Sequence, residues 1–313
     1  MSLTVTVVVC THDRPGHLGR AVEGVLAQTR MPVELIVVKD SPGPPAGELA
    51  ALASAAGVAY QAVNMPRPSL PASRNRGMEL AGGDVVMLLD DDMLMPPEFL
   101  AELLALYEAD DDGRVAGIGV TPALTSAPGM GQRIWDAVSA ALGRGRWVPR
   151  RWAARSVALP WPLRGKLLPA RRLAGGTISL RRRVAKAERF EQAFPGYALS
   201  EDREFCYRVG ARHGLFFCPS LRLTHDVAPA GRPDMKALGR MYVAHSFHIA
   251  ARSIGGGAGT YLVMGCELAG MFALHAGYLL PGDTRAHWGF LAGRSAALMG
   301  LLAKSVRRSL CGS

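Results

Sequence analysis

The stretch Val85–Pro96, VVMLLDDDMLMP, places three aspartates directly after five apolar residues. Five apolar residues in a row, bounded by Gly82-Gly83 and Pro96-Pro97, are typical of a strand buried in a parallel sheet. The aspartates therefore stand at the carboxyl end of a buried strand. Carboxylates about 4 Å apart repel by roughly 4 kcal/mol at an effective dielectric near 20, so the triplet requires a cation or hydrogen-bond donors. A divalent metal ion meets that requirement.

A different interpretation of the same aspartates stays open. Asp92 could help to cap the helix expected to begin near Pro97 and Glu98, with its neighbours facing water. A second triplet, Asp110-Asp111-Asp112, follows a polar helical run and leads into Gly113. We expect a solvated turn there, so this second triplet serves as a control for the first.

The composition of the chain limits its class. With 313 residues, of which 49% are hydrophobic and 20% charged, the chain can bury a sizeable core and is not mainly disordered. The net charge of +10 predicts an anionic partner: nucleotide phosphates, acidic lipid or nucleic acid. The five cysteines show no metal-ligand spacing, and the first apolar run lacks a basic leader. We therefore expect a reducing cytoplasm and no signal peptide.

Strand-like and helix-like segments alternate along the first 120 residues, which predicts an α/β fold with a doubly wound, mostly parallel sheet and helices on both faces. In such sheets, ligands bind outside the carboxyl ends of the strands, where the winding reverses. Three strand ends carry polar groups, in Cys10–Arg14, Lys39–Ser41 and Asp90–Asp92, so we expect a nucleotide at that edge. The expected strands cover residues 5–9, 34–38, 58–63 and 85–89, and the expected helices cover 17–29, 46–56 and 72–83.

These motifs, in this order, resemble those of the family 2 glycosyltransferases, whose single nucleotide-binding domain is of the GT-A type. CTHDRP corresponds to the family's first turn, KDSP to Asp-Asp-Gly-Ser, SRNRG to Arg-Asn-x-Gly and LLDDDM to Asp-x-Asp. Further on, LSEDREF resembles the Glu-Asp motif that opens a helix, and LRLTHD the family's late histidine. The resemblance covers residues 3–230 and is more specific as an ordered set than any single motif.

The resemblance implies a metal-dependent, inverting transfer of a hexose or deoxyhexose from a nucleoside-diphosphate sugar to an acceptor hydroxyl. Transfer of one sugar is favoured because the Gln-x-x-Arg-Trp motif of processive relatives is absent. Asp202 is implied as the base that takes the acceptor proton, with Glu201 beside it. The alternative is that both carboxylates are only structural and complement the helix dipole at the N-terminus of a helix.

The resemblance also implies the binding residues. Mn²⁺ or Mg²⁺ would neutralise the leaving diphosphate. The implied metal ligands are Asp90, Asp92 and His225. The implied contacts of the nucleotide sugar are Thr11, His12, Arg14, Asp40, Arg74, Asp90 and Asp91.

Some positions depart from the family pattern or have two interpretations. His12 stands where the family often has tyrosine, and Lys39 replaces the first of two aspartates, so the base of the nucleotide stays open. His225 is either a ligand or a core histidine in apolar register with Leu221 and Leu223. The glycine pair before Thr177 lets the backbone approach the sugar or simply forms a tight turn.

Residues 143–172 contain no acidic residue and combine nine basic side chains with three tryptophans. Tryptophan prefers the headgroup level of a bilayer, and basic side chains are attracted to anionic lipid. This pattern predicts a protein that is peripheral at the inner face of the cell membrane, with a glycan or lipid-linked acceptor used in building cell-envelope polysaccharide. A solvated basic loop is the alternative. We expect no nucleic acid partner, because no recognition fold accompanies the charge.

The chain is expected to have three parts: a nucleotide-sugar-binding half (1–120), an acceptor-binding catalytic half (121–230) and a C-terminal helical extension (231–313), for which association with the membrane is one option. Residues 259–280 are long enough to cross a bilayer, but Glu267 and His275 oppose insertion, so a span stays only one option. Two rival functions stay open: a sugar-nucleotidyltransferase, and an inactive sugar-binding or membrane-scaffold protein.

Overall fold

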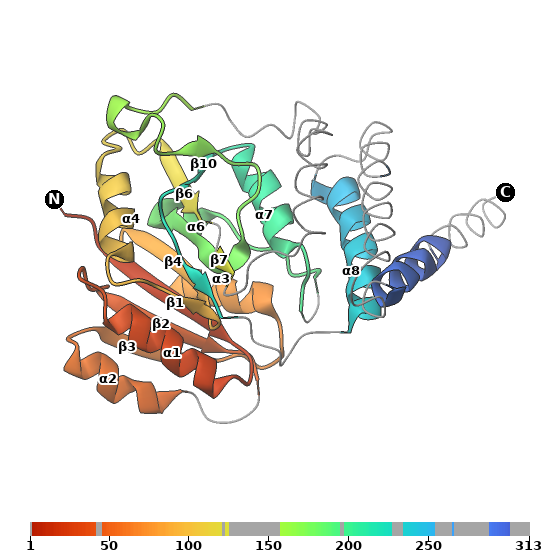
Figure 1. Ribbon diagram of the computed structural model, residues 1–313, viewed down its shortest axis with the longest axis horizontal. Coiled ribbons are helices and arrows are strands. Elements are labelled where there is room, and N and C mark those ends of the chain that lie inside the picture. The colour runs from red at the N-terminus through yellow and green to blue at the C-terminus, as the bar shows by residue number, and fades with distance from the viewer. Residues whose placement is uncertain are drawn as a thin grey trace. The chain divides into compact units, whose positions relative to one another are not determined.

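The computed structural model describes residues 2–41, 46–120, 123–124, 157–194, 197–226, 234–253, 265 and 288–300 (Figure 1). The chain forms two compact units. One consists of Met1–Ser126 with Trp152–Gly231, and the other of Ala127–Arg151 with Arg232–Ser313. All the predicted site residues belong to the first unit.

Within the described residues, the larger sheet has eight strands in the order β3-β2-β1-β4-β9-β6-β10-β8. Strands β3, β2, β1 and β4 run parallel, as do β6 and β10. Strand β9 lies between β4 and β6 and is antiparallel to both. The predicted α/β fold with a mostly parallel sheet is confirmed. The strands are β1 (Val5–Thr11), β2 (Glu34–Lys39), β3 (Ala59–Asn64), β4 (Val85–Asp90), β6 (Val115–Gly119), β8 (Leu168–Pro169), β9 (Ile178–Arg181) and β10 (Gly214–Phe217).

A smaller sheet of three short strands stands beside the end of β4. Its central strand, β11 (Thr224–His225), pairs antiparallel with β5 (Met93–Leu94) and parallel with β7 (Ala123–Leu124). Because β5 follows the aspartate triplet directly, this pairing brings a distant part of the chain to the triplet. The expected alternating strand around His225 is thus only two residues long in the structure.

Helices flank the larger sheet, and their bounds lie within a few residues of those expected. The predicted helix 46–56 is divided into a 3-10 turn, η1 (Gly47–Leu49), and the short helix α2. The first unit contains α1 (Pro15–Leu26), α2 (Ala50–Ala55), α3 (Leu70–Leu80), α4 (Phe99–Glu108), η3 (Trp161–Leu163), η4 (Gly175–Thr177), α6 (Arg182–Ala187) and α7 (Glu201–Gly210); the second contains α8 (Met235–His248), η5 (Ile249–Ser253) and helical residues 288–300.

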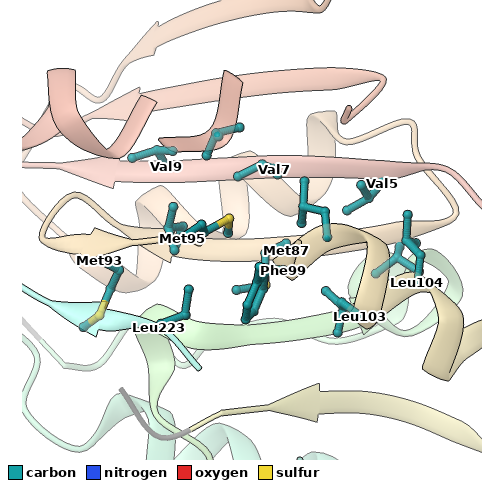
Figure 2. Packing of buried hydrophobic residues seen from close by; sticks show 14 of the residues in the cluster. Val5, Val7, Val9, Met87, Met93, Met95, Phe99, Leu103, Leu104 and Leu223 are labelled. Carbon is teal, nitrogen blue, oxygen red and sulfur yellow. The ribbon is translucent and has the colours of Figure 1, made fainter. Parts of the chain in front are cut away.

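The core has two parts, one on each face of the sheet, because successive strand residues point to opposite faces. Val5, Val7 and Val9 of β1 pack on the face that α1 and α4 cover, and Figure 2 shows them near Met87 and Phe99. Each such fully buried apolar side chain stabilises the fold by roughly 1.5–3 kcal/mol. These contacts pack α1 and α4 against the strands whose carboxyl ends carry the polar residues.

The other face of the sheet is covered by α3, α6 and α7. Val8 and Cys10, the alternate residues of β1, pack there with Met78 of α3 and Phe205 of α7. Helix α3 lies very close to the strand, since a Cβ atom on Gly77 would overlap the side chain of Val8. Because α3 and α7 both pack on this face, their polar residues can meet at the carboxyl edge of the sheet.

The second aspartate triplet differs from its prediction at one position. Asp111 and Asp112 are exposed, as expected for a solvated turn, but Asp110 is buried. The Asp110 carboxylate accepts hydrogen bonds from the backbone N–H groups of Arg114 (3.0 Å) and Val115 (2.7 Å) and from Nη2 of Arg181 (3.0 Å). The solvated-turn prediction was wrong for Asp110, because this residue anchors the start of β6.

Candidate active site

The turns after β1 and β4 are joined through Asp91. The two strands are parallel neighbours, with Cys10 opposite Asp90, so the residues that follow them meet at the carboxyl edge. Thr11 donates its hydroxyl to Oδ2 of Asp91 (2.7 Å), and Arg14 donates Nη1 to Oδ1 (3.0 Å). Burial raises the pKa of Asp91, while these two donors oppose the shift. Asp91 thus holds the two turns together.

Asp92 lies beside His225. Oδ2 of Asp92 and Nε2 of His225 are 3.2 Å apart, and the backbone N–H of Asp226 donates to the carbonyl oxygen of Asp92 (2.9 Å). Asp92 does not cap the following helix, because α4 begins after Glu98 and has no side-chain cap. The imidazole is partly exposed, so the pair offers one carboxylate and one ring nitrogen at the edge of the site.

Asp90 has a different partner from its neighbours. Nη2 of Arg74, in α3, donates to both of its carboxylate oxygens (2.9 and 3.3 Å), and Nη1 of Arg74 donates to Oε1 of Glu201. Arg74 is 1% exposed. Burial acts against its charged form, but Asp90 and Glu201 outweigh burial and raise the pKa of Arg74. Arg74 therefore joins the first aspartate of the triplet to the first residue of α7.

The carboxyl end of β2 forms a second polar cluster. Oδ1 of Asp40 lies 2.7 Å from Nδ1 of His12, and Oδ2 accepts a hydrogen bond from the backbone N–H of Ser69 (3.0 Å). Ser69 caps α3, since its hydroxyl accepts from the N–H of Ala72 at 3.4 Å. The His12 side chain is 45% exposed, so its ring is oriented by Asp40 and remains accessible to a ligand.

The start of α7 follows a strained segment. Ala198 and Ser200 adopt positive φ angles of 53° and 76°, which are costly for residues other than glycine. Glu201 is buried against Arg74, and burial raises its pKa to about 7 although Arg74 lowers it. Asp202 is only half-buried and accepts from the N–H of Arg203 at 2.7 Å. Of the two adjacent carboxylates, Asp202 is the one that a ligand can reach.

The glycine pair in η4 approaches the ion pairs closely. A Cβ atom on Gly175 would lie 2.5 Å from Nη1 of Arg74, and one on Gly176 would overlap the carboxylate of Asp90. Neither glycine has a positive φ, so a tight turn does not require them. Glycine is needed here because the backbone passes directly over Arg74 and Asp90.

The structure thus assembles the predicted residues into linked groups. The first group consists of Thr11, Arg14, Asp91, Asp92 and His225. The second group consists of Arg74, Asp90 and Glu201. Among the described residues, no set of three Asp, Glu, His or Cys side chains is arranged to hold a metal ion. Asp92 and His225 contact each other, whereas Asp90 is paired with Arg74.

Sequence reasoning missed two contacts that orient site residues. Asp226 accepts a hydrogen bond from Nη2 of Arg20 (2.6 Å), which ties the His225 strand to α1. Asn75 exchanges two hydrogen bonds with the backbone of Phe190, at 2.9 and 2.7 Å. In the sequence, Asp226 follows His225 directly and Asn75 follows Arg74 directly, and this adjacency was the available signal.

The basic insertion is described only from residue 157 onward, so Trp147 and Trp152 lie outside the described residues. Trp161 is 79% exposed, with the Arg164 guanidinium 5.8 Å from its ring centroid. Ala158, nearby in the chain, accepts from Arg114 just before β6, at the amino end of that strand. The start of the described insertion therefore lies near the amino end of β6, whereas Leu168 pairs with Phe217, the last residue of β10.

Of the C-terminal stretch 259–280, only residue 265 is described. Over the part of the chain that the structure covers, we find no helix with the length and apolar character needed to span a bilayer.

The chain thus has an α/β domain with a polar carboxyl edge, and comparison with known proteins shows which family this domain resembles. Residues 6–150 match the family described as Glycosyl transferase family 2. The chain is 34% identical over 125 residues to the glucosyl-dolichyl phosphate glucuronosyltransferase of Haloferax volcanii, covering 38% of this chain and 39% of that protein. It is 31% identical over 110 residues to the uncharacterized glycosyltransferase YwdF of Bacillus subtilis, covering 35% and 40%. The matches therefore span about two fifths of these curated relatives.

Solved structures share the GT-A fold. The mannosyltransferase PcManGT from Pyrobaculum calidifontis, in complex with GDP-Man and Mn²⁺, superposes with a TM-score of 0.55 at 16% identity, covering 99% of this chain and 81% of that one. S. aureus TarS 1–349 gives a TM-score of 0.51 at 12% identity, with coverages of 93% and 70%. At these identities the likeness concerns the fold alone.

Proposed function

We propose that the protein is a metal-dependent, inverting glycosyltransferase that moves one sugar from a nucleoside-diphosphate sugar to an acceptor hydroxyl. The observation that carries the proposal is the meeting of the β1 and β4 turns with His225 and the start of α7 at one edge of the sheet. In this proposal, residues 1–120 bind the donor, residues 121–230 bind the acceptor and residues 231–313 form a helical extension.

Asp92 and His225 are the residues proposed to hold a divalent metal ion. Their donor set, one carboxylate oxygen and one imidazole nitrogen, suits Mn²⁺, and such ions commonly complete their coordination with substrate phosphates and water. When bound, the ion supplies Lewis-acid neutralisation of the leaving diphosphate. Asp90 is not proposed as a ligand in this arrangement, because Arg74 already engages both of its oxygens.

Asp202 is proposed to take the proton of the acceptor hydroxyl. A hydroxyl is a poor nucleophile near neutral pH and requires a base within hydrogen-bond reach. Asp202 is half-buried at the start of α7, whereas its neighbour Glu201 is buried on Arg74. Direct attack by the activated hydroxyl on the face opposite the leaving group inverts the anomeric centre.

His12 and Asp40 are proposed to recognise the base of the nucleotide. Both oxygens of Asp40 already have partners within the protein, so His12 presents its ring to the ligand in an orientation that Asp40 maintains. An imidazole can stack on a base and accept or donate one hydrogen bond at Nε2. Structures with this fold bind both GDP-Man and UDP, so the base is left to experiment.

The proposed acceptor is a lipid-linked glycan offered at an anionic membrane surface, with the protein in the cytoplasm. The name of the Haloferax relative gives a dolichyl phosphate glucoside as its acceptor. Trp161 and Leu168 are exposed and lie among Arg164 and Lys166, a combination suited to a bilayer interface. A soluble acceptor is the alternative.

A binding and turnover screen tests the proposed reaction. UDP and GDP are added with and without Mn²⁺ while the unfolding midpoint is recorded, since a ligand that binds only the folded state raises it. UDP- and GDP-sugars are then incubated with the protein and a membrane extract. Release of nucleoside diphosphate supports the glycosyltransferase. In a parallel incubation with UTP or GTP and a sugar 1-phosphate, release of pyrophosphate supports a sugar-nucleotidyltransferase. No turnover in either incubation supports an inactive binding or scaffold protein.

Vesicle binding tests the membrane part separately. Changing Trp161 and Leu168 together to serine should lower affinity for vesicles rich in anionic lipid, and added salt should weaken the wild type. Leu52→Ser is the matched control, because Leu52 is a 48% exposed leucine on α2. If the wild type, the double variant and Leu52→Ser bind vesicles equally, Trp161 and Leu168 do not contact the membrane.

A further inference from the structure

Arg74 joins two parts of the site that the proposed reaction must hold at a set separation. One guanidinium nitrogen donates to Asp90, at the end of β4, and another donates to Glu201, at the start of α7. The residues next to these carboxylates are Asp91 and Asp92 on the donor side and Asp202 on the acceptor side. A single buried side chain thus bridges the two halves.

The surroundings of Arg74 keep it in this position. Its guanidinium lies 5.3 Å from the ring centroid of Phe190, and Phe190 stacks on Phe205 of α7 with centroids 4.1 Å apart. Asn75, the next residue of α3, is hydrogen-bonded to the backbone of Phe190. Helices α3 and α7 are therefore held together by a polar contact and by a packed aromatic pair.

Two features oppose a direct contact between Arg74 and a nucleotide. The side chain is 2% exposed, and Gly175 passes so close that even a methyl group there would meet Nη1. Both terminal nitrogens donate to carboxylates of the protein. An arginine that recognises a ligand would instead present its terminal nitrogens to solvent.

We propose that Arg74 is a positioning residue that fixes the start of α7, and with it Asp202, relative to the donor-binding turn at Asp90. This inference rests on the proposed function and replaces the predicted role of Arg74 as a nucleotide ligand. In this proposal Glu201 anchors the start of α7 to Arg74 and does not act as the base. The guanidinium suits this role because its planar fork holds two carboxylates at a fixed angle, which a lysine ammonium cannot do.

The test compares Arg74→Lys and Glu201→Gln with the wild type. Affinity for UDP and GDP in Mn²⁺ is measured by calorimetry. Turnover is measured as nucleoside diphosphate released from UDP-glucose and GDP-mannose in the presence of a membrane extract that supplies the acceptor. Arg74→Lys should leave nucleotide affinity within about twofold but lower turnover roughly 100-fold, since a misplacement near 1 Å has such an effect. Glu201→Gln, whose amide oxygen still accepts from Arg74, should keep turnover within about tenfold of the wild type.

A matched control separates positioning from general stability. Arg181→Lys alters another arginine that pairs with a buried aspartate, Asp110, at 3.0 Å, away from the site. It should lower the unfolding midpoint and leave turnover per folded molecule unchanged. The inference is overturned if Arg74→Lys weakens nucleotide affinity as much as it lowers turnover, or if Glu201→Gln abolishes turnover.

Hydrogen exchange tests the inference without relying on activity. Arg74→Lys should raise the exchange rates of the first-turn amides of α7 relative to those of the wild type and of Arg181→Lys. Unchanged protection at residues 201–204 would overturn the positioning role. A wild type that turns over no donor would refute the proposed function, and the exchange measurement would then decide the placement of α7 by itself.

Discussion

Nε2 of His225 lies 3.2 Å from Oδ2 of Asp92, although 133 residues separate the two in the chain. The short pairing of β11 with β5 produces this contact, and Asp226 reinforces it through its bond to the Asp92 carbonyl oxygen. In the proposed function this pair holds the metal ion.

Removing either member of the pair should abolish metal-dependent nucleotide binding. For Asp92→Ala and His225→Ala, we expect the part of the midpoint shift that requires Mn²⁺ to disappear. In the wild type that part corresponds to about 2.7 kcal/mol when free ligand is 100-fold above Kd. A thermal-shift titration measures it, and a full Mn²⁺-dependent shift in Asp92→Ala would rule out this metal site.

The second triplet supplies the contrast, with opposite expectations for adjacent residues. Asp110→Ala should lower the free energy of unfolding by about 3–5 kcal/mol, because it leaves Arg181 without its buried partner. Asp111→Ala should change the free energy of unfolding by less than about 0.5 kcal/mol and leave nucleotide binding intact, because Asp111 is exposed. Urea unfolding checks both values. Loss of Mn²⁺-dependent binding in Asp111→Ala would contradict the choice of the first triplet.

Two helix glycines should respond oppositely to alanine. Gly77→Ala forces a methyl group into Val8 and should destabilise the protein by about 1–3 kcal/mol. Gly19→Ala adds a methyl group to α1 where no atom lies within 4 Å, and should stabilise it by up to about 1 kcal/mol. Midpoints in urea measure the difference. Equal changes at both positions would show that α3 does not press on β1.

The pH dependence of stability should reveal the ion pair of Glu108. The side-chain bond from Arg30 lowers the pKa of Glu108 to about 2, below the usual 4.5. A lowered folded-state pKa means that the contribution is full above pH 4.5 and is lost as the pH falls toward 2. Glu108→Gln should therefore cost up to about 1 kcal/mol at pH 7, since both side chains are partly exposed. The gap to wild type should narrow between pH 5 and pH 2; a gap that widens on acidification contradicts this assignment.

The sequence predicted the elements whose signals are local. A continuous apolar run such as Val85–Leu89 indicates a strand that is buried on both faces of the sheet. The polar groups after β1, β2 and β4 converge because parallel strands place their carboxyl ends at one edge. The residues of the donor edge could therefore be named before their contacts were known. Helix starts were also close: the predicted helices beginning at residues 17 and 72 begin at Pro15 and Leu70 in the structure.

Features that depend on distant partners could not be predicted. The burial of Asp110 depends on Arg181, which lies 71 residues away, whereas the two aspartates that follow Asp110 in the sequence are exposed. Arg74 stands in the polar motif SRNRG, which resembles an exposed helix start. Its burial follows from the close packing of Gly77 on β1 and from Phe190, 116 positions further along. Local pattern contains neither relationship.

The most direct measurement of the central claim compares wild type with Asp202→Asn in one assay. Both proteins are given the nucleotide sugar that the binding screen selects, with Mn²⁺ and a membrane extract, and both nucleotide affinity and nucleoside diphosphate release are recorded. We predict equal affinities and a loss of at least about 100-fold in release for Asp202→Asn, because the acceptor proton then has no base. Release by Asp202→Asn at the wild-type rate would contradict the account. So would a wild type that releases no nucleoside diphosphate from any nucleotide sugar but releases pyrophosphate from UTP or GTP and a sugar 1-phosphate.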